Sequence, residues 1–256
     1  GMAPSPAALE AYAARLGLPA PEPLGRIEHL ADSGYVRAER GSLVLIADVG
    51  RIGPDYLPGH AHADTLSFEL SVGGRRCLVN SGTSLYGTGP ERRRQRGTAA
   101  HNGVTVAGAD SSEVWSGFRV ARRARPFGLE IAEEDGAAVI RCAHDGYRRL
   151  RPPAVHRRAW RISDLGLRVE DSVEGRSDAV ARFHFHPGLA VEAEAGGLAG
   201  VARAEAKPAL AWRAEGAGAT IEETTFHPRF GASIPARCLA LHLDEGRSAV
   251  EFRPTT

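Results

Sequence analysis

The stretch GHAHADTLSFELSVGGRRCLVNSGTSLYGTGPERRRQRGTAAHNGVTV, residues 59–106, decides how this chain folds. Within LSFELSV, residues 66–72, apolar and polar residues alternate, which is typical of a half-buried β-strand. Gly73 and Gly74 then form a two-residue turn, and CLVN returns as the second strand of an antiparallel hairpin. A further strand, 104–106, follows a polar, arginine-rich loop. We therefore expect three strand ends to meet beside the sequence AAHN at 99–102.

Three histidines in this stretch predict a chemical site. Side chains at positions i and i+2 leave the same face of a strand, so His60 and His62 are expected to point together. The hairpin would bring Asn80 beside His62, and His101 opens the next strand. The residues thus predict a histidine-rich site on a β-sheet. The alternative is that His60 and His62 are structural histidines whose hydrogen bonds are satisfied.

The rest of the chain is dominated by strand patterns from residue 35 onward. Turn signals such as Glu134-Asp135-Gly136 and Asp244-Glu245-Gly246 separate them. No convincing helix follows the first one, and residues 189–219, rich in Ala and Gly, are hard to assign. The fold class is all-β, a large antiparallel β-sandwich (supersandwich-like) with a short N-terminal helix. Besides those in the opening stretch, strands are expected at 43–49, 118–121, 129–131, 138–142, 159–162, 167–173 and 179–185, with weaker ones up to 252.

The N-terminal segment differs from the rest. Ser5 can cap a helix with Pro6 in its first turn, and Gly17 ends it. A stiff proline-rich linker follows at 19–23. We therefore divide the chain into an N-terminal helix and linker, residues 1–25, and a sandwich domain, residues 26–256. Residues 3–18 do not read as a secretory signal. The helix carries an apolar stripe of Leu9, Tyr12 and Leu16.

Bulk composition narrows the function classes. The chain has 256 residues and a formal net charge of +1, which argues against a surface that generally seeks nucleic acid. A local basic patch for an anionic ligand remains compatible with that charge. No apolar run is long enough to span a membrane. The three cysteines lack C-x-x-C spacing, and Cys77 and Cys142 lie in apolar strands, where they are expected to act as small buried hydrophobes.

The ordered pattern Gly-His-x-His-x-Asp, a hairpin ending in Val-(Asp/Asn)-x-Gly-Thr, a Tyr and Arg loop, and Ala-His-Asn-x-Val resembles the heparinase II/III-like family of polysaccharide lyases. Looser matches at 32–35, 156–158 and 167–171 extend the resemblance over most of the chain. In that family an N-terminal α/α toroid precedes a C-terminal β-sandwich, and the active site lies between them. The match here is to the sandwich alone. The resemblance implies a bacterial, periplasmic setting, whereas the sequence alone leaves the location unknown.

The resemblance also implies roles for individual residues. His60 resembles the catalytic histidine that the sandwich contributes, and Tyr86 resembles a tyrosine near the cleavage site in some members. His62 resembles the first zinc ligand and His101 the last. Asn80 takes the position of an aspartate ligand, and because a neutral amide oxygen is a poor zinc ligand, this departure puts zinc in doubt.

Two arrangements are open at this position. Asp64 and water could complete the zinc shell. Asn80 could instead hold His62 or His101 by hydrogen bonds in a metal-free site.

The chemistry implied is β-elimination on an anionic, uronic-acid-containing polysaccharide. The uronate carboxylate must be neutralised, a base must remove the neighbouring C5 proton, and an acid must protonate the leaving oxygen. Guanidinium groups suit carboxylate or sulfate capture, and we expect this of Arg92, Arg94 and Arg96. The alternative for each is a solvated basic loop.

Other functions compete with this one. A non-catalytic carbohydrate-binding or structural sandwich is the main alternative, because the tyrosine and the asparagine or histidine that the family places on its toroid have no counterpart here. The chain alone is therefore expected to be a weak or inactive lyase. A cupin-like metal enzyme ranks third, since the expected glutamate after the second histidine is missing. We expect His184 and His186 to be structural, and Trp115, Trp160 and Trp212 are either sugar-stacking or packing residues.

Overall fold

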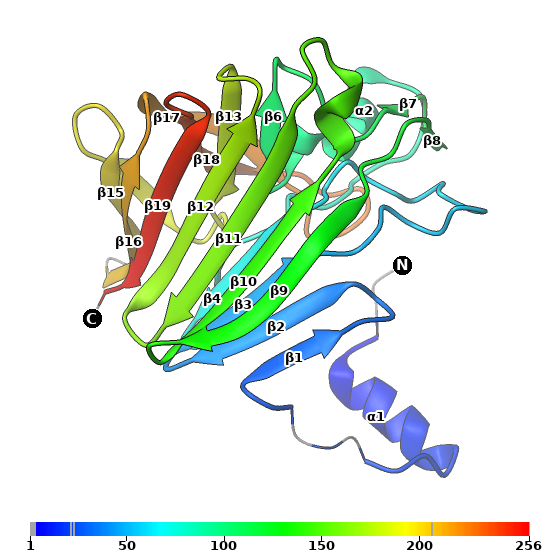
Figure 1. The fold of residues 1–256 in the computed structure, drawn as a ribbon. Helices are drawn as coiled ribbons and strands as arrows, with labels where there is room; N and C mark the ends of the chain where they lie inside the picture. Colours follow the sequence, from blue (N-terminus) through cyan, green and yellow to red (C-terminus); the bar gives the residue numbers. More distant parts are fainter. Residues whose placement is uncertain (1–3, 21, 23, 206, 256) are drawn as a thin grey trace.

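The computed structural model describes residues 4–20, 22, 24–205 and 207–255, and the side chains of 207 and 208 are not considered. Helix α1 (Pro6–Arg15) begins at Ser5, whose side chain accepts a hydrogen bond from the backbone N–H of Ala8, as its sequence predicts. Residues 21 and 23 of the expected linker lie outside the described part. In Figure 1, α1 lies apart from the strands.

Antiparallel sheets make up most of the remaining structure, which confirms the predicted sandwich (Figure 1). A five-stranded sheet runs in sequence order: β1 (Ile27–Leu30), β2 (Tyr35–Arg40), β3 (Leu43–Asp48), β4 (Phe68–Val72) and β5 (Arg75–Leu78). A four-stranded sheet has the order β17 (Gly218–Phe226), β18 (Ile234–His242), β13 (Ala179–His184) and β6 (Val104–Val106).

These two sheets are joined edge to edge. Leu78 at the end of β5 bridges to Phe185, and the N–H of Val79 donates to the carbonyl of His184 at 2.9 Å. The end of β5 therefore continues the edge of β13 beyond β6. This junction brings the residues after β5 next to those before β6.

The second layer is one eight-stranded sheet, which stands in front in Figure 1. Its hydrogen-bonded order is β14-β15-β16-β19-β12-β11-β10-β9. Two short strands, β7 (Val114–Trp115) and β8 (Arg119–Val120), form a separate hairpin. The eight-stranded sheet consists of β9 (Pro126–Glu134), β10 (Ala137–His144), β11 (Val155–Ser163), β12 (Gly166–Glu174), β14 (Ala190–Ala193), β15 (Ala199–Ala204), β16 (Lys207–Glu215) and β19 (Arg247–Pro254).

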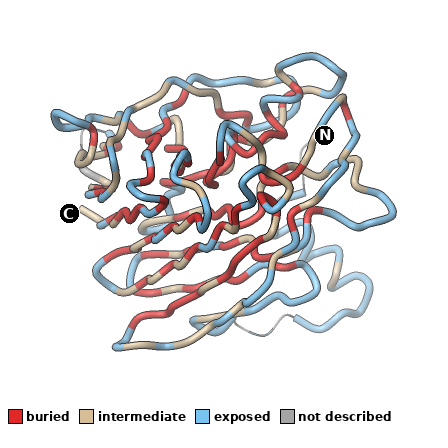
Figure 2. The backbone as a smooth tube through the Cα atoms, turned by 45° about the horizontal axis from the view of Figure 1, so that its top comes forward, coloured by how far each residue is buried: buried red, intermediate tan, exposed pale blue. Residues whose placement is uncertain are grey.

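The hydrophobic core fills the space between the two layers. Figure 2 shows the buried residues of the chain in red. Aromatic rings tie the sheets together: Phe68 of β4 meets Trp160 of β11 at 6.3 Å and Phe183 of β13 at 6.2 Å between ring centroids. Trp160 and Trp212 are buried, so packing, rather than sugar stacking, accounts for them. Cys77 and Cys142 are buried as predicted.

The expectation that no helix follows the first needs correction, and the unassigned residues are now placed. Residues 189–219 contain β14, β15 and β16, and the arginine-rich loop contains a second helix, α2 (Pro90–Arg96). The N-terminal stripe is exposed, because no residue of α1 is buried. Among the described helices, none has the length and apolar character needed to cross a bilayer.

Helix α2 was missed for a physical reason. It has Pro90 at its start, Glu91 in its first turn and arginines in its last turn, all of which favour a helix. Its buried face, however, consists of Arg92, Gln95 and Arg96. A polar face gives no hydrophobic periodicity, which is the main signal for a helix in a sequence.

Candidate functional site

The His60–Asp64 segment is a loop in the structure, so the expectation that it forms a strand is wrong. Helix α2 fixes this loop. The guanidinium of Arg96 donates to the carbonyl of Ala61 from Nε at 3.1 Å and from Nη2 at 3.0 Å, while its own carbonyl accepts from the N–H of Ala63 at 2.8 Å. The backbone between the two histidines is thereby held in place without a strand ladder.

The chain then enters β4 through a tight turn. Leu66 has φ of +65°, a left-handed conformation that costs about 1 kcal/mol for a residue with a Cβ. Hydrogen bonds hold it there: its N–H donates to the carbonyl of Asp48 at 3.1 Å, and its carbonyl accepts from Arg158 at 2.8 Å. The turn directs the segment that carries Asp64 toward the end of the sheet.

Asn80 and His101 form a hydrogen-bonded pair at the junction of the sheets. The Oδ1 of Asn80 accepts from the N–H of Gly82 at 3.2 Å and lies 3.1 Å from Nδ1 of His101. Since an amide oxygen only accepts, Nδ1 of His101 carries the proton. In neutral His101 the Nε2 atom then has a free lone pair, and this buried atom has no hydrogen-bond partner among the described residues.

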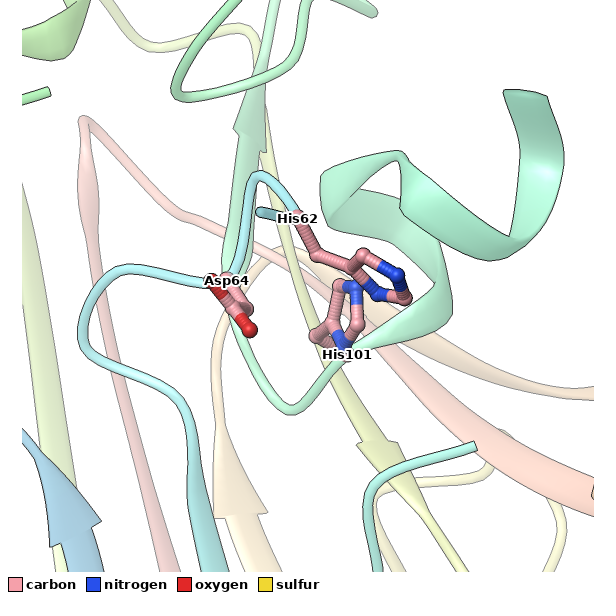
Figure 3. A group of neighbouring side chains, drawn as sticks. All are labelled: His62, Asp64 and His101. Carbon is pink, nitrogen blue, oxygen red and sulfur yellow. The ribbon is translucent and has the colours of Figure 1, made fainter. Parts of the chain in front are cut away.

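His62, Asp64 and His101 come together in one cluster, shown in Figure 3. Each offers a ligand atom, and these atoms lie within 4.8 Å of one another. Burial raises the pKa of the Asp64 carboxyl to about 7 and lowers the pKa of His101 well below its usual value. Two neutral imidazoles and a carboxylate form a possible metal-binding group.

His62 is kept neutral by its surroundings. Burial, and then the positive charges of Arg92 and Arg96, lower the pKa of its imidazole to about 4. Its Nε2 lies 3.3 Å from the hydroxyl of Thr83 and 3.4 Å from Nη1 of Arg92. Metal ions bind the neutral form of histidine, so these charges favour the ligand form at neutral pH.

The three arginines of the sequence prediction occupy different environments. Arg92 and Arg96 are buried; Arg92 donates to the carbonyl of Gly117, and Arg96 to four backbone carbonyls. Arg94 is partly exposed, pairs with Glu91 at 2.7 Å and lines a cavity of about 970 Å³. Of the three guanidinium groups, that of Arg94 is the accessible one.

His60 and Tyr86 lie together on the rim of the site. His60 is exposed, and its ring centroid is 5.6 Å from that of Tyr86 and 5.9 Å from that of Phe118. Tyr86 in turn lies 5.0 Å from Phe230. The structure thus places His60 at the surface and His62 inside, rather than pointing both into one site.

A buried polar network centred on Arg158 and Asp171 holds the backbone next to Asp64 and His101. Arg158 forms a two-pronged ion pair with Asp171, with distances of 2.7 and 2.9 Å, and donates to the carbonyls of Leu66 and Asn102. Asp171 also accepts from Nε2 of His156 at 2.7 Å, and Nδ1 of His156 lies 3.1 Å from Nε2 of His144. The network therefore anchors the segments that carry Asp64 and His101.

Sequence reasoning missed several of these residues. Phe118 and Phe230 come from distant loops, and nothing in their local sequence distinguishes them from other exposed phenylalanines. The network was visible only as part of the loose match at 156–158 and 167–171. His184 is buried as expected, and its Nε2 donates to the carbonyl of Ala99 at 3.0 Å.

Comparisons with known proteins place the fold. A family model described as "Heparinase II/III-like, C-terminal" matches residues 22–253. Among solved structures, a heparinase III gene product superposes with a TM-score of 0.74 at 17% identity, covering 96% of this chain and 38% of that one. The heparan sulfate lyase from Pedobacter heparinus has a TM-score of 0.73 at 15% identity, with 96% and 39% covered. This chain thus spans less than half the length of these neighbours. No curated protein sequence matches it.

Proposed function

This chain belongs to the heparinase II/III-like, C-terminal family, and on that premise we propose that it is the β-sandwich part of a polysaccharide lyase. It acts by β-elimination on anionic, uronic-acid-containing glycans. Because the chain spans 38% of the heparinase III neighbour, it is weak or inactive unless a helical domain completes the cleft. The exposed pair of His60 and Tyr86 beside the partly buried His62-Asp64-His101 cluster is the observation that supports this proposal most.

The reaction needs two proton transfers, and the rim pair offers groups for both. A base removes the proton at C5, the electron pair forms the C4–C5 double bond, and the bond from C4 to the glycosidic oxygen breaks. An acid then protonates that oxygen. The imidazole of His60 can accept a proton and the phenol of Tyr86 can donate one, and their rings are 5.6 Å apart, close enough to flank one sugar linkage.

Arginines contribute in two ways. Arg94 is exposed at the cavity that Ser84 and Leu85 also line, so it can pair with a carboxylate or sulfate. Arg92 and Arg96 are buried and donate to backbone carbonyls. We assign these two a positioning role, which keeps the loop of His60 and His62 in shape.

Zinc fits the cluster of His62, Asp64 and His101. His62, Asp64 and His101 would hold it, because the unpartnered Nε2 of His101 is a buried lone pair that a cation would satisfy. Bound zinc would supply positive charge near the rim, where a uronate carboxylate must be neutralised. In this arrangement Asn80 orients His101 and does not itself bind the metal.

Metal content tests the cluster directly. Elemental analysis of the purified chain, with and without added zinc, is expected to give one zinc per chain. His62→Ala should lose it, while the exposed His29→Ala should keep it. Zinc that persists in His62→Ala would contradict this ligand set.

Activity is tested with heparan sulfate and other uronate polymers, by the ultraviolet absorbance of the unsaturated product. We expect slow product formation that disappears in His60→Ala and persists in His29→Ala. Unchanged turnover in His60→Ala would remove His60 from the mechanism.

A non-catalytic carbohydrate-binding or structural sandwich is the second candidate. The short span of this chain relative to its structural neighbours favours it. Binding of heparan sulfate without any unsaturated product would select the binding module. Neither binding nor product would select a structural role.

A further inference from the structure

An aromatic rim surrounds His60 and carries an inference that rests on the proposed function. Tyr86, Phe118 and Phe230 are 47%, 45% and 52% exposed, and Tyr86 lies 5.3 Å from Phe118 and 5.0 Å from Phe230 between ring centroids. The three rings come from separate segments: the loop before α2, the β7–β8 turn and the loop after β17. A contiguous group of exposed aromatic rings marks a binding surface.

The inner side of this rim is already occupied. The guanidinium carbon of Arg92 lies 5.1 Å from the ring centroid of Tyr86 and 5.7 Å from that of Phe118, and Arg92 is 1% exposed. Cation–π contacts fix the two rings from within and leave their outer sides to solvent. The rings are thus held in place before any ligand arrives, which limits the entropy lost on binding.

Two hollows are lined by residues that flank Tyr86 in the sequence. A groove of about 510 Å³ includes Gly87, Phe118 and Arg119 in its lining, and the cavity of about 970 Å³ includes Leu85 and Arg94. Gly59 and Gly117 also line the smaller groove, and Gly117 has no room for a side chain, because a Cβ there would lie 2.5 Å from the carbonyl oxygen of Gly87. The smaller groove shares Phe118 with the rim, so a sugar unit in it would lie against that ring.

A positive charge beside the rim favours an anionic occupant. Arg119 lines the smaller groove and, within the described residues, has no carboxylate within 4.0 Å. At the larger cavity Arg94 is paired with Glu91, which lines the same cavity, so Arg119 carries the argument. Apolar ring faces next to arginines match a pyranose that presents a C–H face and carries a carboxylate or sulfate.

We infer that Phe118 and Phe230 form a sugar-stacking subsite, in which pyranose rings of an anionic polysaccharide lie against the aromatic rim next to His60. These two residues determine where the glycan lies relative to His60 and do not take part in proton transfer.

The test measures binding of a heparan sulfate tetrasaccharide to the intact, zinc-supplemented chain by calorimetry. Phe118→Ala and Phe230→Ala should each weaken binding about tenfold, whereas Phe118→Trp should retain it. Phe127→Ala is the matched control, since Phe127 is an exposed aromatic residue on β9, away from the rim. Its affinity should equal that of the wild type.

The outcomes separate this subsite from the proposed function. Wild-type binding that both alanine variants retain would overturn the subsite and leave the proposed function standing. A wild type that does not bind the tetrasaccharide would overturn both. Variants that change sedimentation from dimer to monomer, with unchanged affinity, would assign the rim to contact between two copies of the chain and would also overturn the subsite.

Discussion

Asn80 determines how His101 presents its lone pair. Its Oδ1 accepts from Nδ1 of His101 at 3.1 Å and from the N–H of Gly82 at 3.2 Å, so the imidazole orientation and tautomer are both fixed. Removing a group that hydrogen-bonds to a metal-binding histidine typically lowers metal affinity by about 10–100-fold. We therefore expect Asn80→Ala to lower zinc affinity by about that factor, and Asn80→Asp to raise it, because a carboxylate is a stronger acceptor.

Competition with a chelator of known affinity measures the zinc affinity of Asn80→Ala and of Asn80→Asp. Thr83→Val is a useful comparison, because Thr83 contacts His62 and not His101. Equal zinc affinity in Asn80→Ala and the wild type would show that Asn80 does not orient a ligand.

Buried His144 makes stability depend on pH. Burial lowers its pKa well below 6.5, so it stays neutral in the folded chain while the unfolded chain protonates near pH 6.5. The unfolded state then binds more protons as pH falls, and stability decreases. Between pH 7.5 and 5.5, His144 alone lowers the free energy of unfolding by about 1 kcal/mol. The opposite sign holds for Asp64, whose pKa is raised to about 7, so the slope of the whole chain is a sum of opposing contributions.

A substitution isolates the contribution of His144. His144→Gln keeps an N–H donor toward His156 and removes the titration. Urea unfolding at the two pH values should show that the variant loses about 1 kcal/mol less than the wild type on acidification. An identical pH dependence of the two proteins would mean that His144 is protonated in the folded state.

At the scale of elements, α2 controls the loop of His60 and His62 through Arg96. Arg96→Gln would leave buried carbonyls without a donor, which costs on the order of 1–3 kcal/mol. We expect faster hydrogen exchange in peptides covering 59–65. Arg93→Gln is the control, because Arg93 is on the same helix and exposed. Equal exchange in the two variants would argue that the loop holds its shape without α2.

The same elements show what sequence reasoning could and could not predict. The hairpin was predictable because Gly73 and Gly74 both adopt positive φ, 55° and 77°, as a tight two-residue turn requires. The His60–His62 segment was assigned wrongly, since an alternating pattern over so few residues does not separate a strand from a loop clamped by a distant arginine. The sequence left open whether Asn80 bonds to His62 or to His101, and the structure shows the bond to His101.

For the molecule as a whole, the predicted sandwich is confirmed. The position of α1 relative to the sandwich could not be predicted, because a sequence does not show which surfaces a helix contacts. The apolar stripe of the helix was visible in the sequence, and in the structure Leu9, Tyr12 and Leu16 are 53%, 55% and 59% exposed. An amphipathic pattern predicts a helix, but it does not say which surface covers the apolar side.

The sandwich is therefore expected to be stable without α1. No residue of α1 is buried, and the first strand begins at Ile27. A variant that starts at Leu24 should keep its free energy of unfolding within about 0.5 kcal/mol of the full chain, because it removes no core contact. Phe252→Ala in the full chain is the positive control, since removing this buried ring should cost about 3–5 kcal/mol. Urea unfolding followed by tryptophan fluorescence measures all three proteins. A loss of more than about 1 kcal/mol on truncation would show that the helix stabilises the sandwich, and the boundary between the two units would then have to be drawn differently.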